Sequence, residues 1–437
     1  MIQFRNLLRV LVFWATLIVI NCTSYNNYAI YKVIPETKNQ LEFLKSLHEK
    51  FDFWKESRQI GLPSDVMVAP QDQQEFENML NRNNLQYEVV INNVETIIQK
   101  QKVETLLTRS SLGLGDVTFN SFMYYSEQMA YVRRVAEDYP DKASVETIGQ
   151  SYEGTDILLL KISSGPSETS TPKPMIFIDA GIHCREWIAP PVALYIIQQL
   201  VENTTNAALI ENVDWAIAPN VNPDGYSYTQ TTNRLWRKNR RLAEGDACYG
   251  IDLNRNFGYM WMFDGASNYS CDQTYAGPSS FSEPESRAIR DWILPNKDNI
   301  KLYLTFHSYG EMILYPWGYA PIYTENADDL QRVGELAAEA IESSSTINSN
   351  YTVANSAIFL YPAAGASDDW AVGEAEIKLS YTVELPNGDA PYYFMIPARQ
   401  ILPVVQETFQ GVQAFHKYIE EEFWTTNSAS RMRKFIN

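Results

Sequence analysis

The sequence predicts an α/β fold for the larger, C-terminal part of the chain and a small α+β unit before it. Three observations support this expectation. Strand-like and helical runs alternate from about Phe119, polar residues follow the ends of several apolar runs, and residues 25–109 form a separate section. Alternation of this kind is typical of a domain with a mostly buried sheet.

The section at residues 25–109 has short apolar runs at 29–34 and 89–91. Between them, the charged stretches 40–53 and 71–81 carry apolar residues at three- and four-residue spacing, which predicts helices. A further helical stretch ends at Arg109, before the loop sequence S-S-L-G-L-G. A trypsin-like protease could cut at this arginine, and an ordinary interdomain linker is the alternative interpretation.

Beyond Phe119, four apolar runs at 175–182, 213–221, 301–306 and 377–383 predict strands, and helical spacing follows at 191–203, 285–294 and 397–423. Polar side chains follow each of the four strands, in order His183 with Glu186, Asn222 with Asp224, His307, and Glu384. Because open α/β sheets place their sites at the carboxyl ends of strands, we expect these residues to converge on one crevice.

The N-terminus has the pattern of a secretory signal peptide over residues 1–24. Arg5 and Arg9 precede an apolar run at 10–20, and Cys22 and Ser24 supply small residues for cleavage. A membrane anchor is the alternative, but the run is shorter than the roughly 18 residues that a span needs. The net charge of −18 also disfavours binding to nucleic acid or anionic membranes.

Four cysteines are present, and removal of the signal peptide leaves Cys184, Cys248 and Cys271. An oxidising compartment permits one disulfide among three cysteines, and Cys248–Cys271 is the natural pair. Cys184 would then remain a free thiol.

His183 and Glu186 are spaced so that one tight turn can present both side chains to a metal ion. Catalytic zinc usually takes three protein ligands and keeps a fourth position for water. His307, at the end of another strand, is the candidate third ligand. Each residue could equally be a hydrogen-bonded polar group at a strand end, so the spacing alone leaves both interpretations open.

Seven motifs occur in one order along the chain: G-I-H-C-R-E-W, N-P-D-G-Y, N-R-L-W-R-K-N-R, G-I-D-L-N-R-N-F, F-H-S-Y-G, L-Y-P-A-A-G-A-S-D-D-W and Y-T-V-E-L. With these motifs the chain resembles the secreted zinc metallocarboxypeptidases of the pancreatic A/B type. The resemblance runs from about Phe119 to Phe423, and residues 25–109 look like the inhibitory propeptide of that family. A serine hydrolase is disfavoured because the chain lacks a G-x-S-x-G motif.

The resemblance implies a catalytic domain at 110–423 with a central mixed eight-stranded sheet flanked by helices. An α+β propeptide at 25–109 precedes it, and a polar tail at 424–437 follows. It also implies a secreted, monomeric zymogen that a trypsin-like protease activates near Arg109. The substrates would be the C-termini of peptides or proteins, with no nucleic-acid or membrane partner.

The resemblance also implies that one Zn²⁺ per chain is held by His183, Glu186 and His307. Asp252 matches the carboxylate that orients the first zinc histidine. Glu384 matches the general base that acts on water, and Arg237 matches the arginine that stabilises the tetrahedral oxyanion.

Five further residues match positions that bind the substrate in this family. Asn254 and Arg255 match the pair that grips the terminal carboxylate, for which a planar guanidinium is well suited. Arg185 matches a subsidiary carboxylate contact, Tyr361 the mobile tyrosine that caps the last residue, and Tyr309 another substrate contact. Such a carboxylate clamp implies an exopeptidase.

Alignment of A-A-G-A-S-D-D-W on the family pattern places Asp368 at the base of the pocket for the departing side chain. A carboxylate there favours lysine or arginine, as in B-type enzymes. Gly318 and Ser367 match small residues of the pocket wall, and Asp369 matches a structural aspartate. If Asp368 turned away, the enzyme would be A-type and release apolar or aromatic residues. A non-catalytic peptide-binding protein is a further alternative.

The sequence departs from the family pattern at two places. The Arg-Asp that usually follows the catalytic Glu-Leu is replaced by Pro386-Asn387-Gly388-Asp389. We expect this change to affect subsite preference more than catalysis. Cys184 stands where a small residue is commoner, and an inert buried thiol is the expected role.

Overall fold

The computed structural model describes residues 22–48, 50–56, 59–108, 113, 115–167, 172–242, 248–387 and 392–425. Most of the predicted signal peptide, Arg109, Gly388, Asp389 and the tail from residue 426 lie outside this part. No helix within the described part is long and apolar enough to cross a membrane.

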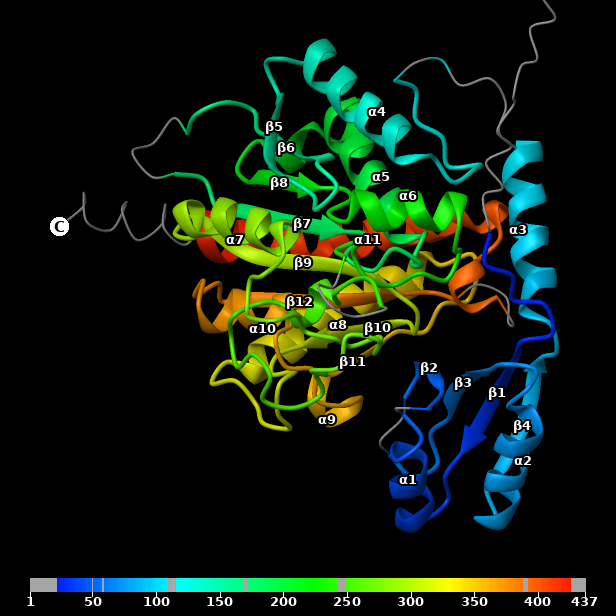
Figure 1. Cartoon of the computed structure of the whole chain (residues 1–437). Helices are drawn as coiled ribbons and strands as arrows, with labels where there is room; N and C mark the ends of the chain where they lie inside the picture. Colours follow the sequence, from blue (N-terminus) through cyan, green and yellow to red (C-terminus); the bar gives the residue numbers. More distant parts are fainter. Residues whose placement is uncertain are drawn as a thin grey trace, which may run out of the picture.

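The N-terminal domain is an antiparallel four-stranded sheet with helices beside it (Figure 1). Its strand order is β2-β3-β1-β4. Its elements are β1 (Ala29–Ile34), α1 (Lys38–Lys45), β2 (Asp52–Lys55), β3 (Ser64–Val68), α2 (Gln73–Arg82), β4 (Gln86–Ile91) and α3 (Val94–Thr108). Its core is the cluster around Tyr31, Val66, Phe76 and Leu80, which lies between the sheet and helices α1 and α2.

The predicted helix over 40–53 is wrong in its second half. Helix α1 starts at the Thr37 capping box and ends at Lys45, and residues 52–55 form strand β2 instead. Phe53 and Trp54 have side chains that favour strands, and β2 pairs along β3. Tertiary pairing therefore overrides the helical spacing in this segment.

The C-terminal domain has a mixed eight-stranded sheet, as expected from the resemblance, with the order β11-β10-β12-β9-β7-β8-β6-β5. Its strands are β5 (Ala143–Gln150), β6 (Asp156–Ile162), β7 (Met175–Ala180), β8 (Asp214–Ala218), β9 (Ile300–Ser308), β10 (Met312–Tyr315), β11 (Thr352–Asn355) and β12 (Leu379–Leu385). Strands β8, β7, β9 and β12 at its centre are parallel to one another.

Helices cover both faces of this sheet (Figure 1). The helices are α4 (Tyr125–Asp138), α5 (Ala189–Val201), α6 (Pro223–Thr231), α7 (Pro284–Asn296), α8 (Ala327–Ser344), α9 (Ser356–Phe359), α10 (Ser367–Gly373) and α11 (Ile401–Ile419), with a π-helical turn at Glu420–Thr425. Alternate residues of β7 enter the two cores: Ile176 and Ile178 pack with α5 and α11, whereas Phe177 packs with α7. This period of two decides which polar side chains share a face.

Strands β7, β9 and β12 bring three of the four predicted strand exits together. Glu384 on β12 pairs with His307 on β9, and the loop after β7 carries His183. The expectation for the second exit was wrong. Asn222 caps helix α6 and donates to the Ile182 carbonyl oxygen, and Asp224 accepts hydrogen bonds from Ser151 and Thr155. Both of these side chains therefore hold loops in place and do not join the metal group.

The predicted disulfide between Cys248 and Cys271 is present and closes a loop that contains the motif at 250–257. The two cysteines are 23 residues apart. Chain entropy predicts that a crosslink of this span stabilises the fold by about 3 kcal/mol. We expect the double variant C248S/C271S to unfold at a lower guanidinium concentration by an amount equivalent to about 3 kcal/mol. A shift equivalent to less than about 1 kcal/mol would contradict this expectation.

Candidate functional site

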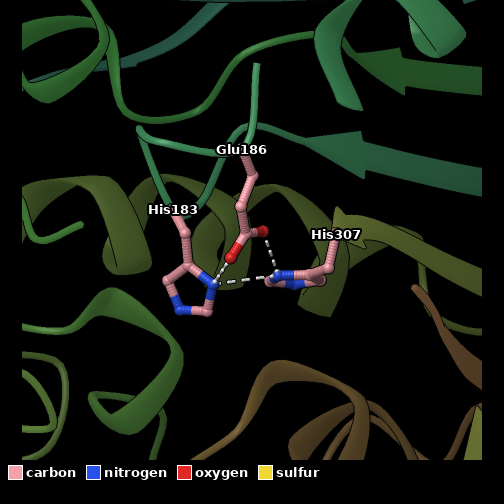
Figure 2. A group of neighbouring side chains, drawn as sticks. All are labelled: His183, Glu186 and His307. Carbon is pink, nitrogen blue, oxygen red and sulfur yellow. Dashed lines mark hydrogen bonds and ion pairs between the residues drawn. The ribbon is translucent and has the colours of Figure 1, made fainter. Parts of the chain in front are cut away.

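His183, Glu186 and His307 form a compact buried group at the carboxyl ends of β7 and β9 (Figure 2). The Nδ1 atom of His183 lies 2.9 Å from Glu186 Oε1, and the Nδ1 atom of His307 lies 3.0 Å from Glu186 Oε2. The two Nδ1 atoms are 3.0 Å apart. Among the described residues this is a set of three potential ligand atoms within 4.8 Å of one another.

The donor set and its spacing fit zinc. Two imidazoles and one carboxylate are the ligands of a class of catalytic zinc sites, and bonds of about 2.0–2.1 Å at tetrahedral angles place ligand atoms about 3.3 Å apart. Two imidazole nitrogens that face each other beside a carboxylate also need a cation between them. Although burial opposes it, contact with Glu186 raises the pKa of His307 to about 9, so a proton is held where a metal ion would bind.

Asp252 supports the first histidine from behind. Its Oδ1 atom lies 3.1 Å from His183 Nε2, and its Oδ2 atom accepts two hydrogen bonds from Arg237 at 3.1 and 2.9 Å. Although burial favours the neutral acid, Arg237 and His183 hold the pKa of Asp252 well below its usual range. Asp252 also caps the short turn at Leu253–Arg255, so one carboxylate fixes both the histidine ring and the following loop.

Arg237 reaches the metal group with the remaining end of its guanidinium. Its Nη1 atom lies 3.9 Å from Glu186 Oε1, while Nε and Nη2 are bound to Asp252. The side chain is therefore oriented by one carboxylate and directed at the centre of the site, where it can stabilise developing negative charge.

Glu384 lies beside the metal group on strand β12. It pairs with His307 in the strand register and lines the same cavity as all three metal-group residues. Desolvation raises the pKa of Glu384 to about 8, and the nearby Glu186 carboxylate acts in the same direction. A carboxylate with a raised pKa next to a metal group can accept and release a proton near neutral pH.

The predicted carboxylate-binding residues line two cavities near this group that share Arg255 and Tyr361. Asn254, Arg255 and Tyr361 line the inner cavity of about 100 Å³, and Arg185, Arg255 and Tyr361 line an outer one of about 480 Å³. Arg255 is held by hydrogen bonds to the carbonyl oxygens of Gly265 and Asn254. Asn254 accepts a hydrogen bond from the Ser367 amide at 2.9 Å, which joins this loop to the start of α10.

Asp368 is buried and lines the inner cavity together with Gly318, Ala366 and Thr382. Burial raises the pKa of Asp368, and a hydrogen bond with Thr382 opposes this shift. No lysine or arginine in the described part of the chain forms an ion pair with it. The cavity next to the metal group therefore contains a buried carboxylate that none of the described lysines or arginines pairs with.

Asp369 and Ser367, on either side of Asp368, have other contacts. Asp369 accepts hydrogen bonds from the backbone amides of Gly318 and Tyr319, both at 2.7 Å. Ser367 does not line the cavity as the sequence led us to expect, and its amide binds Asn254 instead.

Cys184 is a free, buried thiol, as predicted. Its Sγ atom points to the carbonyl oxygens of Arg237 and Lys238, at 3.4 and 3.1 Å, and burial raises its pKa well above the usual range. The side chain thus packs against the irregular segment that carries Arg237. It is directed at backbone oxygens and not at the metal group.

The N-terminal domain covers the mouth of the site. The Tyr309 hydroxyl donates to Asp65 at 3.0 Å, and an oxygen of Asp52 lies 3.6 Å from Arg185 Nη1. Trp54 and Lys55 line the inner cavity together with the metal group and Glu384. Residues of strands β2 and β3 therefore lie against the cavity that contains the metal group.

Comparison with known families gives two matches that together span most of the chain. The model of the zinc carboxypeptidases matches residues 128–411, and the model of the carboxypeptidase activation peptide matches residues 31–101. The first match contains every residue of the metal group, and the second contains the strands that cover the site.

Individual relatives agree with these matches. Carboxypeptidase B of Astacus astacus is 42% identical over 308 residues, covering 70% of this chain and 99% of its own. Zinc carboxypeptidase A 1 of Drosophila melanogaster is 36% identical over 402 residues, covering 89% and 91%. The crystal structure of carboxypeptidase A from Helicoverpa armigera has a TM-score of 0.87 at 33% identity, covering 91% of this chain and 99% of that one. These names include both A and B types, so specificity has to be argued from the pocket.

Proposed function

Because this chain belongs to the zinc carboxypeptidase family and carries an activation peptide, we propose that it is a B-type exopeptidase zymogen that releases C-terminal lysine or arginine. The observation that supports B-type specificity is Asp368, a buried carboxylate in the cavity beside the metal group that pairs with no lysine or arginine of the described segments. A substrate ammonium or guanidinium would supply the missing partner, because a buried unpaired carboxylate is unfavourable.

We propose that His183, Glu186 and His307 hold the zinc ion. When bound, zinc supplies Lewis-acid activation of a water molecule and of the scissile carbonyl group. Glu384 accepts the proton of the attacking water and then delivers it to the leaving amine. Arg237 donates hydrogen bonds to the oxygen that becomes negative in the tetrahedral state.

Asn254, Arg255 and Tyr361 are proposed to hold the last residue of the substrate. A planar guanidinium binds a carboxylate through two parallel hydrogen bonds, so Arg255 fixes the terminal carboxylate at a set distance from the metal group. Only a chain end can satisfy this contact, which restricts cleavage to the last peptide bond. Arg185 lines the outer cavity and Tyr309 the inner one, and both are proposed to contact the substrate once the N-terminal domain has moved away.

Activation is proposed to follow cleavage by a trypsin-like protease near Arg109. Asp52 of the N-terminal domain pairs with Arg185, and Asp65 accepts a hydrogen bond from Tyr309. The domain must therefore move before a substrate can use these two side chains. The proposed boundaries are a signal peptide at 1–24, a propeptide at 25–109, a catalytic domain at 110–423 and a tail at 424–437. Secretion as a monomer is part of the same proposal, based on the signal-like N-terminus and the disulfide.

A panel of four peptides that end in Arg, Lys, Leu or Phe tests this proposal. We expect the full-length chain to release little of any residue. After tryptic cleavage, we expect Arg and Lys to be released at least about tenfold faster than Leu and Phe. The released residue is measured by chromatography, with a zinc chelator as control. Faster release of Leu or Phe would favour the A-type alternative. Full activity before cleavage would contradict the zymogen role.

A further inference from the structure

The ring of His307 is held from the side opposite the metal group. Its Nε2 atom lies 3.1 Å from the Thr305 hydroxyl, and this hydroxyl donates to Asp179 Oδ1 at 2.8 Å. The other oxygen of Asp179 accepts a hydrogen bond from the Tyr303 hydroxyl. All four residues are almost completely buried, with Asp179, Tyr303 and Thr305 at 0% exposure.

The strand register builds this chain of contacts. Residues 303, 305 and 307 lie on one face of β9 because side chains alternate along a strand. Asp179 on β7 pairs with Thr305 across the parallel ladder and lies on the same face. The network therefore rests on two neighbouring strands at the centre of the sheet, where backbone positions are well fixed.

The number of protons available determines which atom donates each hydrogen bond in this network. An ionised carboxylate only accepts hydrogen bonds, so Thr305 must donate its single hydroxyl proton to Asp179. The Thr305 oxygen then has only lone pairs for His307, and His307 Nε2 must carry a proton. The nitrogen left to bind a metal ion is then Nδ1, which faces Glu186 and His183.

We propose that Asp179, acting through Thr305, is a positioning residue that fixes the ring orientation and the tautomer of His307 and thereby strengthens zinc binding. The proposal rests on the proposed role of His307 as a zinc ligand. The support differs from that of His183, which contacts the carboxylate of Asp252 directly. Asp252 is also paired with Arg237, whereas no lysine or arginine of the described segments forms an ion pair with Asp179.

The test measures zinc affinity of the full-length chain by competition with a chelator, which does not depend on peptidase activity. Thr305→Val removes the hydroxyl at nearly constant volume. We expect zinc to bind about 10- to 100-fold more weakly, as for other groups that orient a metal ligand. Thr305→Ser keeps the hydroxyl and should stay within about threefold of the wild type. Asp179→Asn has one acceptor oxygen for two donors, and we expect a loss of about tenfold or more.

A spectroscopic readout separates positioning from general loss of packing. With Co²⁺ in place of zinc, the visible spectrum should change in Thr305→Val and remain that of the wild type in Thr305→Ser. Thr408→Val is the matched control, because Thr408 is a buried threonine of helix α11 outside the metal group. We expect the control to bind zinc as the wild type does. Thermal melting of each variant shows whether it is folded, and the Thr305 variants decide the question if Asp179→Asn is not.

The contact chain from Asp179 through Thr305 to His307 is here called the relay. The outcomes distinguish the relay from the assignment of His307 as a ligand, on which it rests. If His307→Ala binds zinc as tightly as the wild type, the assignment of His307 as a ligand fails. If His307→Ala loses zinc but Thr305→Val binds it normally, only the relay is overturned. Equal losses in Thr305→Val and Thr305→Ser, or in Thr305→Val and Thr408→Val, would also overturn the relay, because the effect would then come from packing.

Discussion

Replacement of Glu384 by glutamine is expected to lower kcat/KM for peptide hydrolysis by about 10²- to 10⁴-fold while the protein keeps its zinc. Glutamine has the same shape but cannot accept a proton from water. Glu384 lies beside the metal group and is not one of its three residues, so its loss should leave zinc in place. The measurement combines steady-state kinetics of the activated enzyme with its zinc content.

A matched control for this variant is Glu407→Gln. Glu407 is buried, whereas Glu384 is partly buried, and Glu407 lies on helix α11 and accepts a hydrogen bond from Ser349. We expect the control to hydrolyse the peptide within about twofold of the wild-type rate, since Glu407 does not line the site. If Glu384→Gln keeps more than about a tenth of wild-type kcat/KM at full zinc content, another group must act as the base.

The pH dependence of the wild type gives an independent view of the same carboxylate. Only the ionised form of Glu384 can accept a proton, so activity should rise with pH as this group loses its proton. Without metal, desolvation raises the pKa of Glu384 to about 8. A zinc ion nearby favours the ionised form, so the acidic limb of the kcat/KM profile should lie below that value.

The sequence indicated the metal group because its residues lie within motifs of recognisable order. His183 and Glu186 are three residues apart, and His307 ends a strand whose neighbour carries Glu384. The mixed sheet of eight strands and the Cys248–Cys271 disulfide were expected and are confirmed. These features are local in sequence or follow from the family resemblance.

The features that the sequence did not indicate depend on pairing between distant segments. Asp179 and Thr305 are 126 residues apart, and only the register of β7 on β9 places them in contact. Polar residues at alternate positions of a buried strand, here Tyr303, Thr305 and His307, are the signal that could have revealed the relay. Asn222 and Asp224 show the opposite error: they follow a strand, as site residues do, yet they serve a helix cap and a loop.

The spacing of residues in the sequence also could not predict the contacts between the N-terminal domain and the rest of the chain. Asp65 meets Tyr309 across 244 residues, and Gln101 on α3 donates to the Ile396 carbonyl oxygen across 295 residues. Both contacts depend on how the two domains dock. A pattern within either unit carries no information about that surface.

Replacement of Asp368 by asparagine is expected to change substrate preference more than catalysis. Loss of one partner of a buried ion pair costs about 2–5 kcal/mol, which corresponds to roughly 30- to 4,000-fold in kcat/KM for a peptide that ends in arginine. For a peptide that ends in leucine we expect an increase or a change of less than about threefold, because the asparagine side chain carries no charge to desolvate. The ratio of the two kcat/KM values is the quantity to measure.

Asp369→Asn is the matched control, since Asp369 is the neighbouring buried aspartate and binds the backbone amides of Gly318 and Tyr319. Its loss should disturb the pocket wall and lower kcat/KM for both peptides without reversing their order. If Asp368→Asn leaves the ratio of arginine to leucine release unchanged, the carboxylate at the cavity does not select the substrate. Specificity would then have to come from the shape of the cavity. That result would favour the A-type alternative, because a pocket that does not use its charge accepts apolar side chains.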